Sequence, residues 1–176
     1  TGANEVFWRG NNPIATGTAH LPDGRPVLDG APTEFRDRLF QLDELEQSRL
    51  FREEAFAFIR EHPVRALQLY GSKLYFFWWF SPSSGIEYPR SFLLGYQVWY
   101  VPVLLLGGLG LWRERAVFRN VRGWLLFSYV LSIPLMQSLC YVNGRHRWTV
   151  EPLLMLFTAA AMVWLLLAYG SARQDF

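Results

Sequence analysis

The stretch SFLLGYQVWYVPVLLLGGLGLW, residues 91–112, decides the fold class of this chain, because it holds 22 consecutive uncharged residues between Arg90 and Arg113. At 1.5 Å per residue, an α-helix of that length is roughly 33 Å long, which matches the ~30 Å hydrocarbon core of a bilayer. The sequence therefore predicts a helix that crosses a membrane.

Two more apolar stretches follow it. GWLLFSYVLSIPLMQSLCYVNG, residues 123–144, is again free of charge, and its Pro134 is tolerated in a membrane helix because neighbouring helices satisfy the freed carbonyl. PLLMLFTAAAMVWLLLAYGSA, residues 152–172, begins with a proline suited to a first helical turn. A soluble helical core with three such runs would have no polar face. We therefore expect an all-α, polytopic membrane protein with about three transmembrane helices in residues 91–176.

The composition supports this class. Hydrophobic residues make up 51% of the chain and charged residues 18%, below the ~25% usual in soluble proteins. Residues 1–63 hold 7 Lys/Arg against 11 Asp/Glu, and residues 64–176 hold 10 against 4, so an acidic front half precedes a basic, apolar back half. Disordered and collagen-like classes are excluded, no nucleic-acid partner is expected, and the single Cys140 allows no intrachain disulfide.

The charge distribution predicts the orientation in the membrane. The linker RERAVFRNVR, residues 113–122, carries four arginines against Glu114 alone. The positive-inside rule places such a linker in the cytoplasm. Residues 1–91 and the turn 143–148 are then expected on the outer side of the membrane.

Residues 64–80, VRALQLYGSKLYFFWWF, are apolar enough for a fourth crossing, but a crossing there would move the arginine-rich linker outside. We therefore expect residues 63–80 to form an interfacial or re-entrant helix, with Lys73 snorkelling to head groups or facing a polar cavity.

The front half is predicted in two parts. Residues 1–42 are rich in Gly, Asn and Pro without a sustained period, and we expect an external loop there. Residues 43–62 read as an external amphipathic helix, since Asp43 and Glu46 have capping-box spacing and His62-Pro63 ends the pattern.

The strongest polar cluster is Arg145-His146-Arg147, two arginines on a turn of the outer side, against the usual charge bias. Arginine offers a fork of donors to phosphate, so Arg145 and Arg147 are candidates for binding a lipid phosphate. The alternative is head-group snorkelling. Glu151, at i,i+4 from Arg147, would orient that guanidinium or form a plain ion pair with it.

Other candidates are weaker. Lys73 either meets the same phosphate or snorkels. Asn11 and Asn12 beside Trp8 suit sugar hydroxyls, although asparagines that cap their own backbone would give the same pattern. His20 and His62 lack partners at metal-ligand spacing, so we expect no metal site or other cofactor from this chain.

Three segments resemble a known family. EVFWRGNNPIATG (5–17), EEAFAFIREHPVRALQLYGSKLYFFW (53–78) and GRHRWTVEPLLMLFTAAA (144–161) are similar, in order, to segments of bacterial membrane glycosyltransferases related to the dolichyl-phosphate-mannose protein mannosyltransferases, glycosyltransferase family 39. The chain departs from the family pattern at Ala3, His146, Thr149 and Glu151, where Gly, Tyr, an apolar residue and Pro are usual.

The resemblance implies a GT-C type enzyme of the bacterial inner membrane that moves a sugar from a polyprenyl-phosphate carrier to an acceptor on the periplasmic side. Arg145, Arg147 and Lys73 would stabilise the departing phosphate, with His146 and Glu151 orienting them. The family's catalytic acid lies in an earlier external loop, so this chain is expected to be the C-terminal portion, inactive without the N-terminal remainder. No catalytic residue is assigned to it. The alternatives are a non-enzymatic, membrane-anchored binding or assembly subunit, and a fragment of a lipid-carrier transporter.

Overall fold

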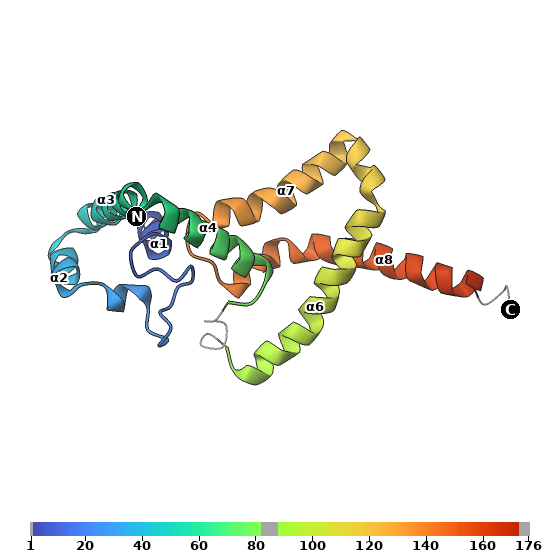
Figure 1. The fold of residues 1–176 in the computed structure, drawn as a ribbon, viewed down its shortest axis with the longest axis horizontal. Helices are drawn as coiled ribbons and strands as arrows, with labels where there is room; N and C mark the ends of the chain where they lie inside the picture. The colour runs from blue at the N-terminus through green and yellow to red at the C-terminus, as the bar shows by residue number, and fades with distance from the viewer. Residues whose placement is uncertain (1, 82–87, 173–176) are drawn as a thin grey trace. The chain divides into compact units, whose positions relative to one another are not determined.

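The computed structural model of the protein describes residues 2–81 and 88–172, and these are all-helical (Figure 1). Among the described residues, His20 and Pro26 form an isolated antiparallel β-bridge. The helices, with η for 3₁₀, are α1 (Gly2–Gly10), η1 (Val27–Gly30), α2 (Thr33–Gln41), α3 (Glu44–Glu61), α4 (Pro63–Trp78), α6 (Arg90–Arg113), η2 (Arg115–Arg119), α7 (Val121–Gln137), η3 (Gly144–Thr149) and α8 (Glu151–Ala172).

The chain divides into two compact units. The first, called the head unit, comprises residues 1–87 and 134–147, and the second, called the span unit, comprises residues 88–133 and 148–176. The boundary falls inside α7, close to Pro134.

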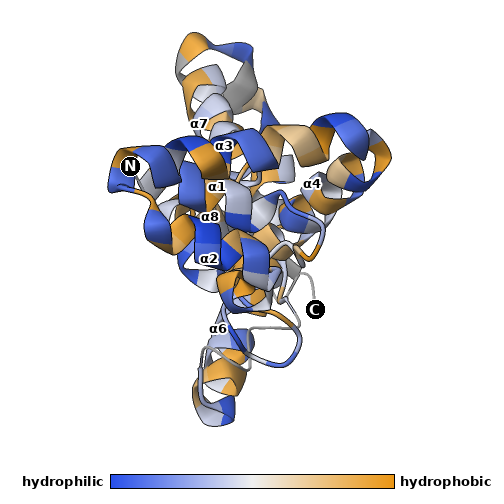
Figure 2. Ribbon diagram, turned by 90° about the vertical axis from the view of Figure 1, so that its left-hand side faces the viewer, coloured by the Kyte–Doolittle hydropathy of each residue, from blue (hydrophilic) through white to orange (hydrophobic). Residues whose placement is uncertain are grey.

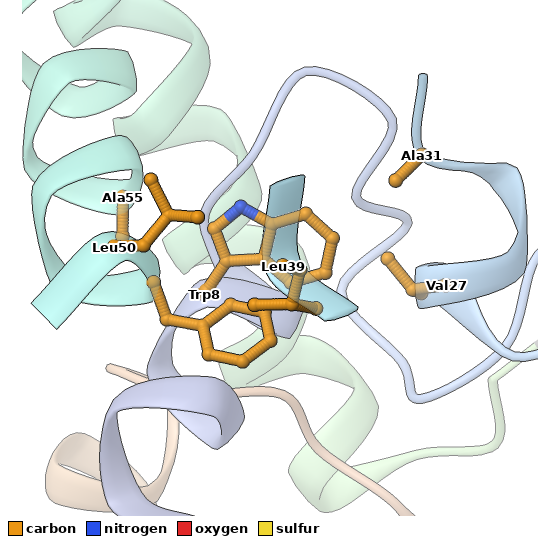
Figure 3. Packing of buried hydrophobic residues seen from close by; sticks show 7 residues of the cluster. Trp8, Val27, Ala31, Leu39, Leu50 and Ala55 are labelled. Atoms are coloured by element: carbon orange, nitrogen blue, oxygen red, sulfur yellow. The ribbon is translucent and has the colours of Figure 1, made fainter. Parts of the chain in front are cut away.

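The head unit is built around Trp8 of α1, which is 4% exposed. Its indole stacks on Phe35 of α2, with ring centroids 5.1 Å apart, and meets Phe51 of α3 at 5.3 Å. Figure 3 shows the indole between Leu50 and Ala55 on one side and Val27 and Ala31 on the other. Burying a side chain of this size contributes several kcal/mol, so these short helices hold together through one aromatic cluster.

The loop expected over residues 1–42 is therefore wrong in part, because α1, η1 and α2 lie within it. Each of these helices is too short to show a repeating apolar period, and each is fixed by the side chain it contributes to the core, such as Leu39 of α2. A turn with Gly24 at φ 90°, where glycine is favoured, does occur between them.

The amphipathic helix predicted for residues 43–62 is confirmed as α3. Asp43 Oδ1 accepts from the amides of Leu45 (2.9 Å) and Glu46 (2.8 Å), and Glu46 Oε2 accepts from the Asp43 amide (3.3 Å), which is a complete capping box. Pro63 starts α4 directly after His62. Figure 2 shows hydrophilic and hydrophobic stretches alternating along α3.

Two described helices, α6 and α8, are long and apolar enough to cross a membrane. In each helix, only 17% of an apolar stretch of 18 residues is buried inside the protein, whereas the core helix of a soluble protein is mostly buried. Arg90 and Arg113 bound α6 as the charge-free run predicts. The exposed side chains include Leu105, Trp112, Leu156, Leu166 and Leu167, which suits contact with lipid.

Small residues let α6 and α8 approach closely. The Cβ of a larger residue at Gly110 would clash with the carbonyl of Phe157, and one at Gly107 would lie 3.1 Å from Leu154 O. Close approach through glycine is a common way for membrane helices to pack. The Thr158 hydroxyl, 3.0 Å from Val103 O, adds a hydrogen bond across the pair.

The two helices run in the same general direction. Near their starts Tyr96 donates to the Glu151 carboxylate, and near the C-terminal end of α6 the Arg113 guanidinium lies 5.6 Å from the Trp164 ring. The chain between Arg113 and Glu151 must therefore return along the length of the pair.

The second span predicted, residues 123–144, is shorter than expected. Helix α7 ends at Gln137, and its apolar part, Gly123–Gln137, is a short helix of about 22 Å. The uncharged residues after it belong to the head unit, where the Val142 amide donates to Gly17 O (3.0 Å). In this segment, the lack of charged residues reflects packing within the head unit and not a membrane crossing.

Helix α4, 16 residues or about 24 Å long, is not among the candidate spans, and its interfacial position stays a prediction.

Candidate functional site

The segment after α7 carries the predicted cationic cluster on an ordered turn. Asn143 accepts the Arg145 amide at its Oδ1 (3.1 Å) and donates its own amide to His146 Nδ1 (3.3 Å). These bonds cap the start of η3, as an asparagine commonly does at a turn. The turn is thus held by its own side chains, and Asn143 is a positioning residue that the sequence analysis missed.

Arg145 and Arg147 differ sharply in accessibility. Arg145 is exposed, whereas Arg147 is 2% exposed. The Arg147 guanidinium carbon lies 4.8 Å from the centroid of the Phe80 ring, and its Nε donates to Gly144 O (3.5 Å). A desolvated cation–π contact of this kind is worth about 2 kcal/mol. Arg147 therefore fixes the turn to the segment after α4, and Arg145 is the guanidinium presented to solvent.

His146 lies between these two arginines, half-buried. Burial, and then the positive charge of Arg145, lower the pKa of His146 below its ordinary value. The ring is therefore neutral at pH 7, with Nδ1 accepting from the Asn143 amide (3.3 Å) and the proton on Nε2. A neutral ring orients the turn and adds no charge to an anion site.

Lys73 is fully buried in the head unit. Its Nζ donates to Gly10 O (3.0 Å) and to Asn11 Oδ1 (3.1 Å), at the C-terminal end of α1. A cation is favourable at that end of a helix because the last carbonyls carry partial negative charge. Burial lowers the pKa of Lys73 from 10.5 to about 8, with the nearby Cys140 acting in the opposite direction. Lys73 therefore meets polar groups of the protein and does not snorkel to head groups, while its predicted phosphate contact stays a prediction.

The residues proposed for sugar contact have structural partners. Asn11 Nδ2 donates to Phe7 O (2.8 Å) and Leu139 O (2.6 Å), while Asn12 Nδ2 donates to Trp8 O (2.8 Å). Both asparagines and Trp8 are buried. The alternative reading, in which the asparagines cap their own backbone, is the arrangement observed; Asn11 also ties α1 to the segment after α7.

Glu151 is buried at the start of α8, where it accepts a hydrogen bond from Tyr96 of α6. The sequence analysis did not foresee Tyr96, because no local pattern links positions 55 residues apart. Arg147 and Glu151 belong to different units, so their pairing stays a prediction.

The described residues contain no group of three or more His, Cys, Asp or Glu side chains able to hold a metal ion. The cationic residues of the head unit are thus the chemical feature of interest: Arg145 exposed, Arg147 stacked and Lys73 buried. Of these three, the exposed Arg145 can contact an anion, whereas Arg147 and Lys73 are held by protein partners.

No family model, curated protein or solved structure matches the chain. A functional argument therefore starts from the residues and their geometry.

Proposed function

We propose that this chain forms the C-terminal part of a GT-C type membrane glycosyltransferase, which moves a sugar from a polyprenyl-phosphate carrier to an acceptor on the periplasmic side. The three segments that resemble this family support the proposal. So does the presence of two helices suited to a membrane. The chemistry is displacement at the anomeric carbon, in which a base on the rest of the enzyme activates the acceptor and cations stabilise the leaving phosphate.

The observation that carries the proposal is the capped turn of η3. It presents Arg145 to solvent while Arg147 is held over Phe80, and the apolar helix α8 starts six residues after Arg145. An exposed guanidinium on a held turn, a few residues before an apolar helix in the sequence, fits a phosphate at the bilayer surface. In this proposal Arg145 contacts the carrier phosphate, and Arg147, Asn143 and His146 position it. Lys73 supports the same region from inside, through Asn11.

Activity of the intact enzyme tests these roles. Charge-assisted hydrogen bonds are worth about 1.5–3 kcal/mol, so Arg145→Ala should lower kcat/KM for the lipid-linked donor by roughly ten- to a hundredfold. Arg145→Lys should recover part of this loss, because an ammonium cannot form the bidentate fork.

The matched control is Arg52→Ala on α3, which removes another exposed arginine from the same unit and should leave kcat/KM unchanged. Near-normal activity of Arg145→Ala across donor concentrations would show that Arg145 is a head-group anchor. Transfer activity from the 176 residues alone would contradict the assignment of the base to another part of the enzyme.

The orientation has a separate test. In a Cys140→Ser background, single cysteines at the exposed positions Asn120 and Trp148 should react with a membrane-impermeant thiol reagent from opposite sides of the membrane. Labelling of both from the same side would refute the proposed topology.

A further inference from the structure

The span unit contains an apolar cavity near the C-terminal end of α6. Its volume is about 470 Å³, and it is lined by Glu114, Ala159, Ala160, Val163, Trp164 and Leu167. Five of these residues lie on one side of α8, where small Ala side chains leave room beside larger ones. The cavity is therefore a groove along α8, apolar apart from Glu114 at its edge.

Guanidinium groups stand beside indole rings at this end of the helix pair. Trp164 lines the groove, and its ring also makes a cation–π contact with Arg113, whose guanidinium carbon lies 5.6 Å from the ring centroid. The Arg115 guanidinium lies 5.3 Å from the ring centroid of Trp112. These contacts hold Arg113 next to the apolar groove, and both arginines remain exposed.

The charge of the linker indicates what the groove accommodates. Residues 113–122 hold four arginines and one glutamate, a net charge of +3. Trp112 and Trp124 are exposed on either side of the linker, as aromatic residues are at a membrane interface. An apolar groove that opens beside clustered arginines complements a molecule with an acyl chain and an anionic head group.

We propose that this groove binds an anionic phospholipid of the bilayer, with an acyl chain along Ala160, Val163 and Leu167 and the phosphate against Arg113 and Arg115. Lipid phosphate accepts the guanidinium hydrogen bonds, and because no head-group cation cancels its negative charge, that charge offsets the arginines that Glu114 leaves unbalanced. A protein helix would fill the apolar groove but would leave that charge uncompensated. The inference concerns the opposite end of the helix pair from η3 and holds independently of the glycosyltransferase proposal.

The experiment compares lipid retention by the intact protein reconstituted with phosphatidylglycerol or with phosphatidylcholine, counted by native mass spectrometry after detergent extraction. The native protein should retain phosphatidylglycerol in preference to phosphatidylcholine. Each basic residue near an anionic surface contributes a factor of about five, so Arg113→Gln/Arg115→Gln should weaken phosphatidylglycerol binding about thirtyfold. Ala160→Phe, which fills the groove, should lower retention without a change in charge.

Two controls match these variants. Arg49→Gln/Arg52→Gln removes the same charge from exposed positions of α3, and Gly170→Phe adds the same ring to α8 where nothing lies within 4 Å. Both should retain phosphatidylglycerol as the native protein does, with unchanged helix content in circular dichroism.

Unchanged retention by either test variant, or an equal loss in its control, would overturn the proposal. A groove that mediates pairing of two copies would show itself differently: Ala160→Phe would dissociate a dimer while the lipid count stayed constant, and this too would overturn it.

Discussion

The head unit and the span unit place the same kind of side chain in opposite environments. Trp8 of the head unit is 4% exposed and lies between two phenylalanines, whereas Trp112 of the span unit is 62% exposed. The head unit also buries three long or polar side chains, Lys73, Asn12 and Arg147. The head unit is organised like a protein in water, and hydrogen bonds hold the polar groups of Lys73, Asn11 and Asn12. The span unit turns its apolar surface outward, as a bilayer requires.

The largest effect expected from this comparison concerns the two tryptophans. Trp8→Ala should destabilise the head unit by about 3–5 kcal/mol, because it removes the ring around which α1, α2 and α3 pack. Trp112→Ala should cost less than about 1 kcal/mol, since it loses an exposed ring and one cation–π contact. Denaturant unfolding in detergent micelles, followed by far-ultraviolet circular dichroism, measures both. Equal costs would show that the two units do not differ as described.

A pH titration addresses the buried cation of the head unit. The folded pKa of Lys73, about 8, lies below its ordinary value of 10.5, so folding must bury a charge at any pH below 8. Between pH 8 and 10.5 the unfolded chain binds more protons than the folded one, and stability therefore rises with pH, by up to about 3 kcal/mol. Above 10.5 the gain is complete.

Cys140 opposes this trend, because burial raises its thiol pKa and stability then falls as the pH passes its ordinary value of 9.0. The measurement is therefore made in a Cys140→Ser background, with and without Lys73→Met. The stability difference between these two proteins, from thermal unfolding in detergent, should change between pH 8 and 10.5. A constant difference would mean that the Lys73 ammonium is not desolvated.

The smallest effect expected lies in the helix pair of the span unit. Gly110→Ala should cost about 1–3 kcal/mol, because its Cβ meets the Phe157 carbonyl and the helices must separate. Gly108→Ala is the matched control two residues away, where nothing lies within 4 Å, and it should be neutral or stabilising by up to about 1 kcal/mol. Unfolding in mixed micelles, followed by helix content, separates the two. Equal effects would show that glycine packing does not hold this pair.

Several features followed from local sequence. The charge-free run of residues 91–112 predicted α6 almost to the residue, because a bilayer sets the length of a helix and arginines mark its ends. Asp43 and Glu46 predicted the start of α3, since a capping box depends on residues three positions apart. The proline that starts α4 is local in the same sense.

Other features required contacts between distant residues. The run at 123–144 looked like another span, yet its last residues are buried beside Gly10 and Gly17 of the head unit, which no pattern within the run could show. The sequence identified the cationic candidates, but it did not predict how accessible each one is. The Phe80 ring lies over Arg147, and Gly10 and Asn11 accept hydrogen bonds from Lys73.

The sequence by itself determined the all-helical class, the apolar helices suited to a membrane and the position of the arginine-rich turn, because hydrophobic length, helix caps and charge act within a few residues of one another. Only the tertiary structure decided that Arg145 is the exposed cation, that Glu151 meets Tyr96, and that an apolar groove opens beside Arg113. Burial, hydrogen bonding and cavity shape arise between segments far apart in the chain, so they are fixed when those segments pack and not before.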